Sequence, residues 1–354
     1  MAWKRRRVRI SYTPPFLMKT ILTGLRSNSM LTIGNYLGAL LPMVRLAEKH
    51  SKDNHFNLFV PDLHSIISDV DGGDLQANIL RNIKFYLAAG LPLNENVHIY
   101  RQSHVPAHSE LCWILNCTAT MGELNRMTQY KEKGEGKASV NVGIFDYPVL
   151  MAGDILLYSA TYIPVGEDQF QHIELARNLA ERFNNRFGET FVVPATTREQ
   201  VEFMGMSDGI RIRDLMNPEK KMSKSTAAEN SKIMLDDAPA KAAKKIMSAT
   251  TDSIGKIKFD MWNQPGISNL LQIEALVTDT PLQDVISTWT GETRYGELKK
   301  KVAASVSGML EEFQARLAEI SDAEVYELLE KGEKYANEVA AKKLLDAQRA
   351  VGLR

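Results

Sequence analysis

Cysteines, long apolar runs and an excess of charge of either sign are scarce or absent in this 354-residue sequence. Without a run of about 18 apolar residues, a membrane-spanning helix is not expected. The only two cysteines, Cys112 and Cys117, do not imply a disulfide framework, and no Cys/His cluster has zinc-site spacing. Free thiols fit the reducing cytoplasm, where we expect the protein to reside. Because 43 basic residues balance 43 acidic ones, binding of a polyanion over the whole surface of the protein is disfavoured. The balance does not decide whether one local surface binds nucleic acid.

The first 17 residues differ from the rest of the chain. They carry five basic side chains and no acidic one, and they include Pro14 and Pro15. A secretory signal would need an apolar stretch after such charges, and this segment has none. Two interpretations remain: a basic arm that touches RNA, or a disordered extension. We favour the extension, because the first convincing strand begins at Met18.

The first part of the chain alternates strand-like and helix-like patterns. Residues 19–24, 56–60 and 97–103 have the character of strands, and the apolar run at 56–60 is typical of a buried parallel strand. Helical spacing begins at Gly34 and again over residues 75–89. This alternation predicts an α/β fold with a doubly wound parallel sheet, which binds nucleotides at the carboxyl ends of its strands.

The pattern changes near Thr226, where strand-like runs become scarce. Stretches rich in Ala, Lys, Glu and Leu follow at residues 239–249, 297–320 and 322–352, so we expect a C-terminal all-helical domain. Its last helix could pack back on the first domain. The expected organisation is an extension, an α/β domain and a helical domain over residues 1–17, 18–225 and 226–354.

The most specific motif is the loop Lys221–Ser225, with the sequence KMSKS. Lys221 and Lys224 carry compact charges on flexible stems, so they can follow a phosphate chain. As charge develops on a departing pyrophosphate, such ammonium groups stabilise the transition state more than the ground state. A solvated basic loop is the plain alternative.

A second motif, Thr32–Asn35 with the sequence TIGN, lies after the first expected strand. Gly34 lets the backbone approach a nucleotide, and the N-terminus of the adjoining helix attracts anions. Thr32 and Asn35 supply uncharged donors to phosphate oxygens. A helix cap explains the four residues alone, but the KMSKS loop downstream favours a nucleotide site.

In this order, the two motifs resemble the signatures of the class I aminoacyl-tRNA synthetases, and TIGN is similar to the form found in the bacterial tryptophan-specific branch. The resemblance runs from about Met18 to the C-terminus. It implies a Rossmann-like catalytic domain, a helical anticodon-binding domain and a homodimer. It also implies that ATP activates L-tryptophan to an adenylate, from which tRNA(Trp) then takes the amino acid. Mg²⁺ would enter through the ATP phosphates, without a set of protein ligands.

The segment Tyr147–Asp154 resembles the amino-acid pocket of that branch. If it is helical from Val149, Met151 and Asp154 are three residues apart and face the same way. A carboxylate can accept a hydrogen bond from the donor-only indole N–H, and methionine can pack on the ring. The resemblance assigns the N–H contact to Asp154 and the ammonium contact to Tyr147. Alternatively, Met151 belongs to the core and Asp154 is an ordinary polar helix residue.

The turn Val165–Gln169 precedes an amphipathic helix that we expect to end at Gly188. By resemblance, Gly166 and Asp168 hold the ATP ribose, and Gln169 holds the amine or carboxyl group of the substrate. Asp168 could also be a helix N-cap, and one carboxylate could do both.

The stretch Gly122–Lys137 resembles the part of the family that helps form the dimer interface and delivers a lysine to the ATP phosphates. We assign that lysine to Lys133. His64 aligns with a pocket histidine of the family, although a lone histidine is as often structural. His104 and His108 are interpreted as structural.

Two positions depart from the family's pattern. The loop before TIGN lacks the usual Pro-small-Gly turn, and Arg26 could reach a phosphate or carboxylate with more charge than the glutamine common there. Leu22 stands where an aromatic residue often lines the pocket, so ring stacking on the substrate is not expected from it. These changes affect the detail of the pocket more than the reaction.

The expected site residues fall into three sets. The catalytic set is Lys224, Lys221, Lys133, Thr32 and Asn35. The ATP-binding set is Gly24, Arg26, Thr32, Gly34, Asn35, Gly166, Asp168, Ile212, Lys221, Met222, Ser223 and Lys224. The tryptophan-binding set is Leu22, His64, Tyr147, Met151, Asp154 and Gln169.

Three other functions remain open. A tyrosyl-tRNA synthetase would share the fold and both signatures, although Met151 and Asp154 favour tryptophan. A nucleotidyltransferase that makes a cofactor carries a similar first motif, but the full KMSKS loop and the long helical tail count against it. A non-catalytic RNA-binding paralogue is disfavoured by the intact lysines of that loop.

If the helical domain meets the anticodon end of tRNA, as the resemblance implies, basic side chains should contact the RNA backbone. A solvated helix face explains the same charges equally well. The candidates are Lys241, Lys244, Lys245, Lys256 and Lys258.

Overall fold

The computed structural model describes most of the chain. The described residues are 18–25, 31–67, 72–128, 141–205, 211–224 and 226–354. The N-terminal extension, Arg26, Lys133 and Ser225 therefore lie outside them. Within the described ranges, no helix is both long enough and apolar enough to cross a membrane.

Parallel strands form a sheet in the order β3-β2-β1-β4. The strands are β1 (Thr20–Gly24), β2 (His55–Val60), β3 (Val97–Arg101) and β4 (Ala160–Tyr162). The chain runs outward from β1 to β3 and then returns to add β4 on the other side of β1. The order therefore reverses between β1 and β4, where a doubly wound sheet opens a crevice for ligands. The predicted fold class is confirmed.

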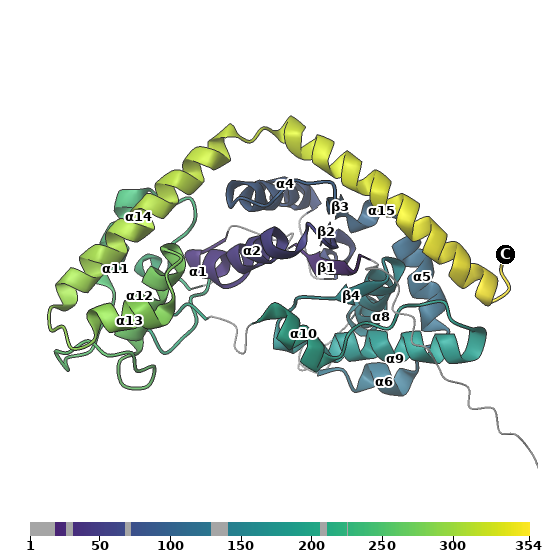
Figure 1. Cartoon of the computed structure of the whole chain (residues 1–354), viewed down its shortest axis with the longest axis horizontal. Coiled ribbons are helices and arrows are strands. Elements are labelled where there is room, and N and C mark those ends of the chain that lie inside the picture. The colour runs from purple at the N-terminus through teal and green to yellow at the C-terminus, as the bar shows by residue number, and fades with distance from the viewer. Residues whose placement is uncertain (1–17, 26–30, 68–71, 129–140, 206–210, 225) are drawn as a thin grey trace, which may run out of the picture.

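Helices cover the two faces of the sheet and build the C-terminal part (Figure 1). Those of the first part are α1 (Ile33–Asn35), η1 (Tyr36–Leu40), α2 (Leu41–His50), α3 (Asp62–Ser65), α4 (Gly72–Ala88), η2 (Gln102–His104), α5 (Ala107–Asn116), α6 (Met121–Asn125), α8 (Val142–Leu157), η3 (Glu167–Gln169), α9 (Phe170–Phe187) and α10 (Thr197–Met204). Those of the C-terminal part are η4 (Glu229–Ser231), α11 (Pro239–Ser248), α12 (Pro265–Val277), α13 (Leu282–Trp289), α14 (Tyr295–Glu319) and α15 (Asp322–Ala350).

Successive strand residues face two different cores. Ile21 and Leu58 join a cluster with residues of α2 and α4 that continues into the C-terminal helices. Leu22 and Phe59 join a second cluster with residues of α5, α8 and α9. Because both faces are covered, β2 is apolar almost without interruption.

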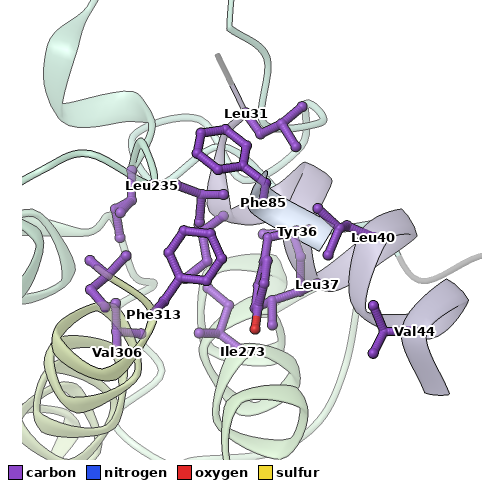
Figure 2. Packing of buried hydrophobic residues seen from close by; sticks show 14 of the residues in the cluster. Leu31, Tyr36, Leu37, Leu40, Val44, Phe85, Leu235, Ile273, Val306 and Phe313 are labelled. Atoms are coloured by element: carbon purple, nitrogen blue, oxygen red, sulfur yellow. The ribbon is translucent and has the colours of Figure 1, made fainter. Parts of the chain in front are cut away.

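The first core crosses from the α/β part into the helical part (Figure 2). The ring of Phe313, on α14, meets the Tyr36 ring edge-on at 5.4 Å and lies 5.7 Å from the Phe85 ring of α4. Leu235, which precedes α11, belongs to the same cluster. The two expected domains therefore share apolar packing at this junction, and the division at Thr226 stays a prediction.

Helix α15 returns along the α/β part and lies across the edge strand β3 (Figure 1). Arg101 forms a two-point ion pair with Glu333 at 2.5 and 3.1 Å. The His98 ring stacks on Tyr335 with centroids 3.4 Å apart, and Gly332 approaches the strand backbone closely. The helix thus covers a strand edge that would otherwise offer unpaired backbone groups to other chains.

Most predicted elements lie close to their expected bounds. The helix expected over residues 75–89 begins earlier, at Gly72. Strand β4 was not predicted, because three residues are too few to show a pattern. Helix α8 begins earlier than the expected Val149, since the Asn141 side chain caps it and Pro148 is accommodated inside it.

Candidate functional site

Loops at the carboxyl ends of the strands carry expected site residues. Gly24 ends β1, His64 follows β2, Gln102 follows β3 and Gly166 follows β4. Because the carboxyl ends of all strands of a parallel sheet lie at the same edge, residues far apart in the sequence come together here. The described site residues come from these loops, from α8 and from the two signature motifs.

The two signature motifs lie against each other. A Cβ atom built on Gly34 would lie 3.4 Å from the Met222 Cβ atom and 3.5 Å from the Ile212 Cβ atom. The Met222 amide donates to the Ile212 carbonyl oxygen at 3.0 Å, and both side chains are buried. The KMSKS segment therefore packs on the TIGN turn, and a Cβ atom at position 34 would make ordinary van der Waals contact with it.

Thr32 and Asn35 cap the helix that begins at Ile33. The Thr32 hydroxyl accepts a hydrogen bond from the Asn35 amide at 3.2 Å, and the Asn35 Oδ1 atom accepts one from the Thr32 amide at 3.1 Å. Thr32 is fully buried, whereas Asn35 is half-buried. The helix cap that the sequence allowed is present, and a phosphate contact by either side chain stays a prediction.

The KMSKS loop is anchored through its backbone. Arg213 and Lys221 form an antiparallel bridge, and the Lys232 ammonium donates to the carbonyl oxygens of Lys224 and Thr226. Lys221 and Lys224 are themselves exposed. Sequence reasoning missed Lys232, because a single lysine eight residues after Lys224 gives no local signal.

Helix α8 carries three residues of the expected amino-acid pocket. Tyr147, Met151 and Asp154 are separated by four and then three residues, so they share one face of the helix. The Tyr147 hydroxyl lies 2.9 Å from the His172 Nε2 atom, and its ring meets the His64 ring edge-on. Tyr147 and Asp154 are buried and Met151 is half-buried.

Asp154 is a fully buried carboxylate with three hydrogen-bond partners. Its Oδ1 atom lies 2.7 Å from Gln102 Nε2 and 2.6 Å from His108 Nδ1. Its Oδ2 atom lies 2.8 Å from His64 Nε2. Burial opposes ionisation, but the hydrogen bonds from His108 and His64 outweigh it and lower the pKa of Asp154 to about 2. The pocket therefore contains an ionised group that can only accept hydrogen bonds.

Gln102 and His108 are partners of Asp154 that sequence reasoning did not connect to it. His108, interpreted as structural, is fully buried, and its Nδ1 atom lies 2.6 Å from the Asp154 Oδ1 atom. Gln102 had no assigned role, although it lies at the end of β3, where polar groups of such sheets gather. Asp154 lies 46 residues from His108 and 52 from Gln102, so no local pattern connects them.

The turn Gly166–Gln169 is exposed at its centre. The Asp168 Oδ2 atom accepts a hydrogen bond from Gln169 Nε2 at 2.7 Å. A Cβ atom on Gly166 would come within 2.7 Å of Asp168 Oδ1, so glycine leaves space for the carboxylate. The N-cap residue of α9 is Gln169, and therefore Asp168 is not the helix cap that the sequence allowed. Its exposed carboxylate can accept hydrogen bonds from ligand hydroxyls.

Leu22 and Met151 belong to the same apolar region. Leu22 is buried in the second core, and Met151 packs against that cluster. The interpretation of Met151 as a core residue therefore holds in part, while its half-buried side leaves area for a ligand ring.

The lysines expected to face RNA divide into two groups. Lys245 is buried with its ammonium 2.6 Å from the Asp237 carboxylate, so the phosphate contact expected for it is wrong. Lys241 also pairs with Asp237, at 3.4 Å. Lys256 and Lys258 are exposed, as a phosphate contact requires.

Comparisons with known proteins identify a family and similar chains. The family described as tRNA synthetases class I (W and Y) matches residues 18–311. The tryptophan–tRNA ligase of Caldanaerobacter subterraneus subsp. tengcongensis is 44% identical over 337 residues, which cover 95% of this chain and 99% of that protein. The tryptophanyl-tRNA synthetase structure from Mycoplasma pneumoniae has a TM-score of 0.79 at 33% identity, covering 96% of this chain and 99% of the other. The Campylobacter jejuni tryptophanyl-tRNA synthetase, complexed with ADP and tryptophan, has a TM-score of 0.75 at 30% identity, covering 94% and 100%.

Proposed function

Because the chain belongs to the class I tRNA synthetases for tryptophan and tyrosine, we propose that its crevice activates L-tryptophan with ATP and transfers it to the 3′ end of tRNA(Trp), releasing AMP and pyrophosphate. The observation that carries the choice of tryptophan is the shared face of α8, on which the buried and ionised acceptor Asp154 lies at a fixed separation from Tyr147 and Met151. An indole N–H can only donate, which suits a carboxylate. The names of the relatives support the same substrate.

In the first step, the tryptophan carboxylate attacks the α-phosphorus of MgATP and pyrophosphate leaves. No nucleophilic side chain is needed, so catalysis comes from positioning and charge stabilisation. Lys221, Lys224 and Lys133 neutralise the phosphates, while Thr32 and Asn35 orient them. Mg²⁺ enters as part of the substrate, held by the ATP phosphates.

The ribose of ATP lies at the turn that follows β4. The exposed Asp168 carboxylate accepts hydrogen bonds from the ribose hydroxyls, and Gly166 allows the sugar to approach the backbone. In the second step, the terminal ribose of tRNA attacks the adenylate carbonyl and AMP leaves. The remaining residues assigned to ATP are Gly24, Arg26, Gly34, Ile212, Met222 and Ser223.

Tryptophan lies against the face of α8 that carries Tyr147, Met151 and Asp154. Asp154 accepts a hydrogen bond from the indole N–H, and the Tyr147 hydroxyl oxygen accepts one from the ammonium group. Gln169 contacts the amine or carboxylate. A site built around a buried acceptor rejects side chains that lack the donor. The indole ring packs against Leu22, His64 and Met151.

ATP–pyrophosphate exchange with each of the twenty amino acids tests reaction and substrate together. We expect exchange with tryptophan alone. Exchange with tyrosine instead would assign the chain to the other branch of the family. A folded protein that binds tRNA but exchanges with no amino acid would be a non-catalytic relative, and the proposal would fail.

The helical part, residues 226–354, contacts the anticodon end of tRNA in this proposal. Trp262 is 94% exposed, and its turn is held because the Asp260 carboxylate accepts from the Trp262 amide at 3.1 Å. Lys256 and Lys258, close to it in the sequence, are exposed as well. An exposed aromatic ring that lies close in the sequence to exposed basic side chains suits stacking on an unpaired base.

A second copy of the chain is the proposed partner of an exposed apolar surface. Each of its four side chains is at least 66% exposed: Ile66, Trp113, Met121 and Val142. They come from the end of α3, from α5 and α6, and from the start of α8, which packs on both α5 and α6. The Asn141 side chain donates to the Ile67 carbonyl oxygen and brings the first and last of these segments together. Apolar surface of this kind favours a protein interface, here a homodimer.

A further inference from the structure

We propose that His108 and Gln102 are positioning residues, which orient the Asp154 carboxylate so that a single acceptor position on its Oδ2 atom stays open for the indole N–H. This inference rests on the proposed function, in which Asp154 receives that hydrogen bond. Both residues bond to Oδ1, the oxygen that is not offered to the substrate, so they act through Asp154 rather than by touching the substrate.

The number of donors around Asp154 carries the argument. An ionised carboxylate offers about four acceptor positions, two on each oxygen. On Oδ1, Gln102 Nε2 at 2.7 Å and His108 Nδ1 at 2.6 Å fill both positions. On Oδ2, His64 Nε2 at 2.8 Å fills one. The fourth acceptor position lies on Oδ2, the oxygen that is hydrogen-bonded to His64. Of the three donors, only His64 is partly exposed.

The protonation of His108 follows from its two neighbours. Its Nδ1 atom faces a carboxylate that can only accept, so Nδ1 carries the proton. Its Nε2 atom lies 3.0 Å from the Tyr158 hydroxyl, which donates to it when the ring is neutral. Tyr158 thus fixes the tautomer that makes His108 a donor to Asp154.

Loss of either Oδ1 donor changes what Asp154 presents to the substrate. The carboxylate could then turn an empty position of Oδ1 toward the pocket, or take up a proton because burial without hydrogen bonds favours the neutral acid. A protonated acid donates as well as accepts, so it no longer requires an N–H from its ligand. Discrimination between tryptophan and an analogue without that N–H should therefore fall.

The discriminating measurement is the ratio of kcat/KM in pyrophosphate exchange for tryptophan and for 3-(3-benzothienyl)alanine, in which sulfur replaces the indole N–H. In the unaltered protein we expect a ratio of at least about 100, because the sulfur analogue cannot donate the hydrogen bond that the indole N–H gives to a charged acceptor. H108N places an amide nitrogen near the Nδ1 position and should keep the ratio within about threefold. H108Q places its amide near Nε2 instead, and the ratio should fall at least about tenfold. Q102M, which keeps the side-chain length without a donor, should behave like H108Q.

Each variant serves as its own reference, because both substrates are measured on the same folded fraction. H98N is the matched control, since His98 is a half-buried histidine that stacks on Tyr335 without contact to Asp154. An unaltered ratio in H108Q and Q102M would overturn the positioning role, as would an equal loss in H108N and H108Q. An unaltered ratio in D154L, which has no side-chain acceptor, would instead remove Asp154 from substrate recognition. Absence of tryptophan activation by the unaltered protein would contradict the proposed function itself.

Discussion

Gly332 lies where helix α15 comes closest to the edge strand β3. A Cβ atom at this position would lie 1.9 Å from the Ile99 carbonyl oxygen and 2.6 Å from the carbonyl carbon. These are backbone atoms, so no change of rotamer relieves the clash. In Gly332→Ala the helix must withdraw from the strand by at least about 1 Å to restore van der Waals contact.

That withdrawal would loosen the contacts on either side of the glycine. The Arg101–Glu333 ion pair is bidentate and largely buried, and the His98 ring stacks directly on Tyr335. Combined with overpacking at the glycine itself, their disturbance should lower the free energy of unfolding by about 3 kcal/mol.

Urea unfolding followed by far-UV circular dichroism measures this change, and hydrogen exchange of the β3 amides locates it. Gly308→Ala is the matched control, because Gly308 also lies inside a long helix and a Cβ there meets nothing within 4 Å. The control should gain about 0.5–1 kcal/mol from better helix propensity. If Gly332→Ala is as stable as the unaltered protein, the close approach of α15 to β3 is wrong.

Four further predictions follow from the site and its surfaces. Lys224→Ala should lower the rate of tryptophan-dependent pyrophosphate exchange at least about 100-fold with little change in tryptophan affinity, because the lysine acts on departing phosphate; unchanged exchange would remove it from the mechanism. Trp262→Ala should weaken tRNA binding about tenfold in a filter-binding assay and leave exchange unaltered, whereas equal affinity would exclude base stacking. Trp113→Glu should convert a dimer to a monomer in analytical ultracentrifugation, and a dimer that persists would place the interface elsewhere. Burial and the neighbouring His55 lower the pKa of His98 from 6.5 to about 4, so its contribution to stability is present above pH 6.5 and lost as the pH falls toward 4; urea midpoints of His98→Phe should decline less over that range.

The sequence predicted those parts of the fold that have a local pattern. Strand β2 is a largely apolar run, and α9 shows a helical apolar face that ends at Gly188 with a φ of 99°, so both were predicted close to their bounds. Strand β4 depends on pairing with β1 across the chain, and three residues carry no period of their own. The family was predicted from the TIGN and KMSKS motifs in order and is confirmed by the match over residues 18–311.

The site was predictable only where a motif names its residues. Gly34, Met222 and Ile212 were assigned to one nucleotide site, and the structure brings them into contact. Gln102 and Lys232 were missed because their roles depend on partners that the fold supplies: a carboxylate on another element for Gln102, and loop carbonyl oxygens for Lys232. The error at Lys245 has the same origin, since burial against Asp237 is a tertiary property.

Asp154 alone does not separate tryptophan from tyrosine. A phenol hydroxyl donates a hydrogen bond as an indole N–H does, and an ionised carboxylate accepts either. The two amino acids differ in where the donor lies: at the far end of one ring in tyrosine, and on the side of a fused ring system in tryptophan. In the proposed roles, Tyr147 contacts the amine and Asp154 the ring donor, and both lie on one helix, roughly 10 Å apart along its axis. Because the helix fixes that separation, and Met151 packs on the same face between them, selectivity between the two rings depends on the geometry of α8 as a whole.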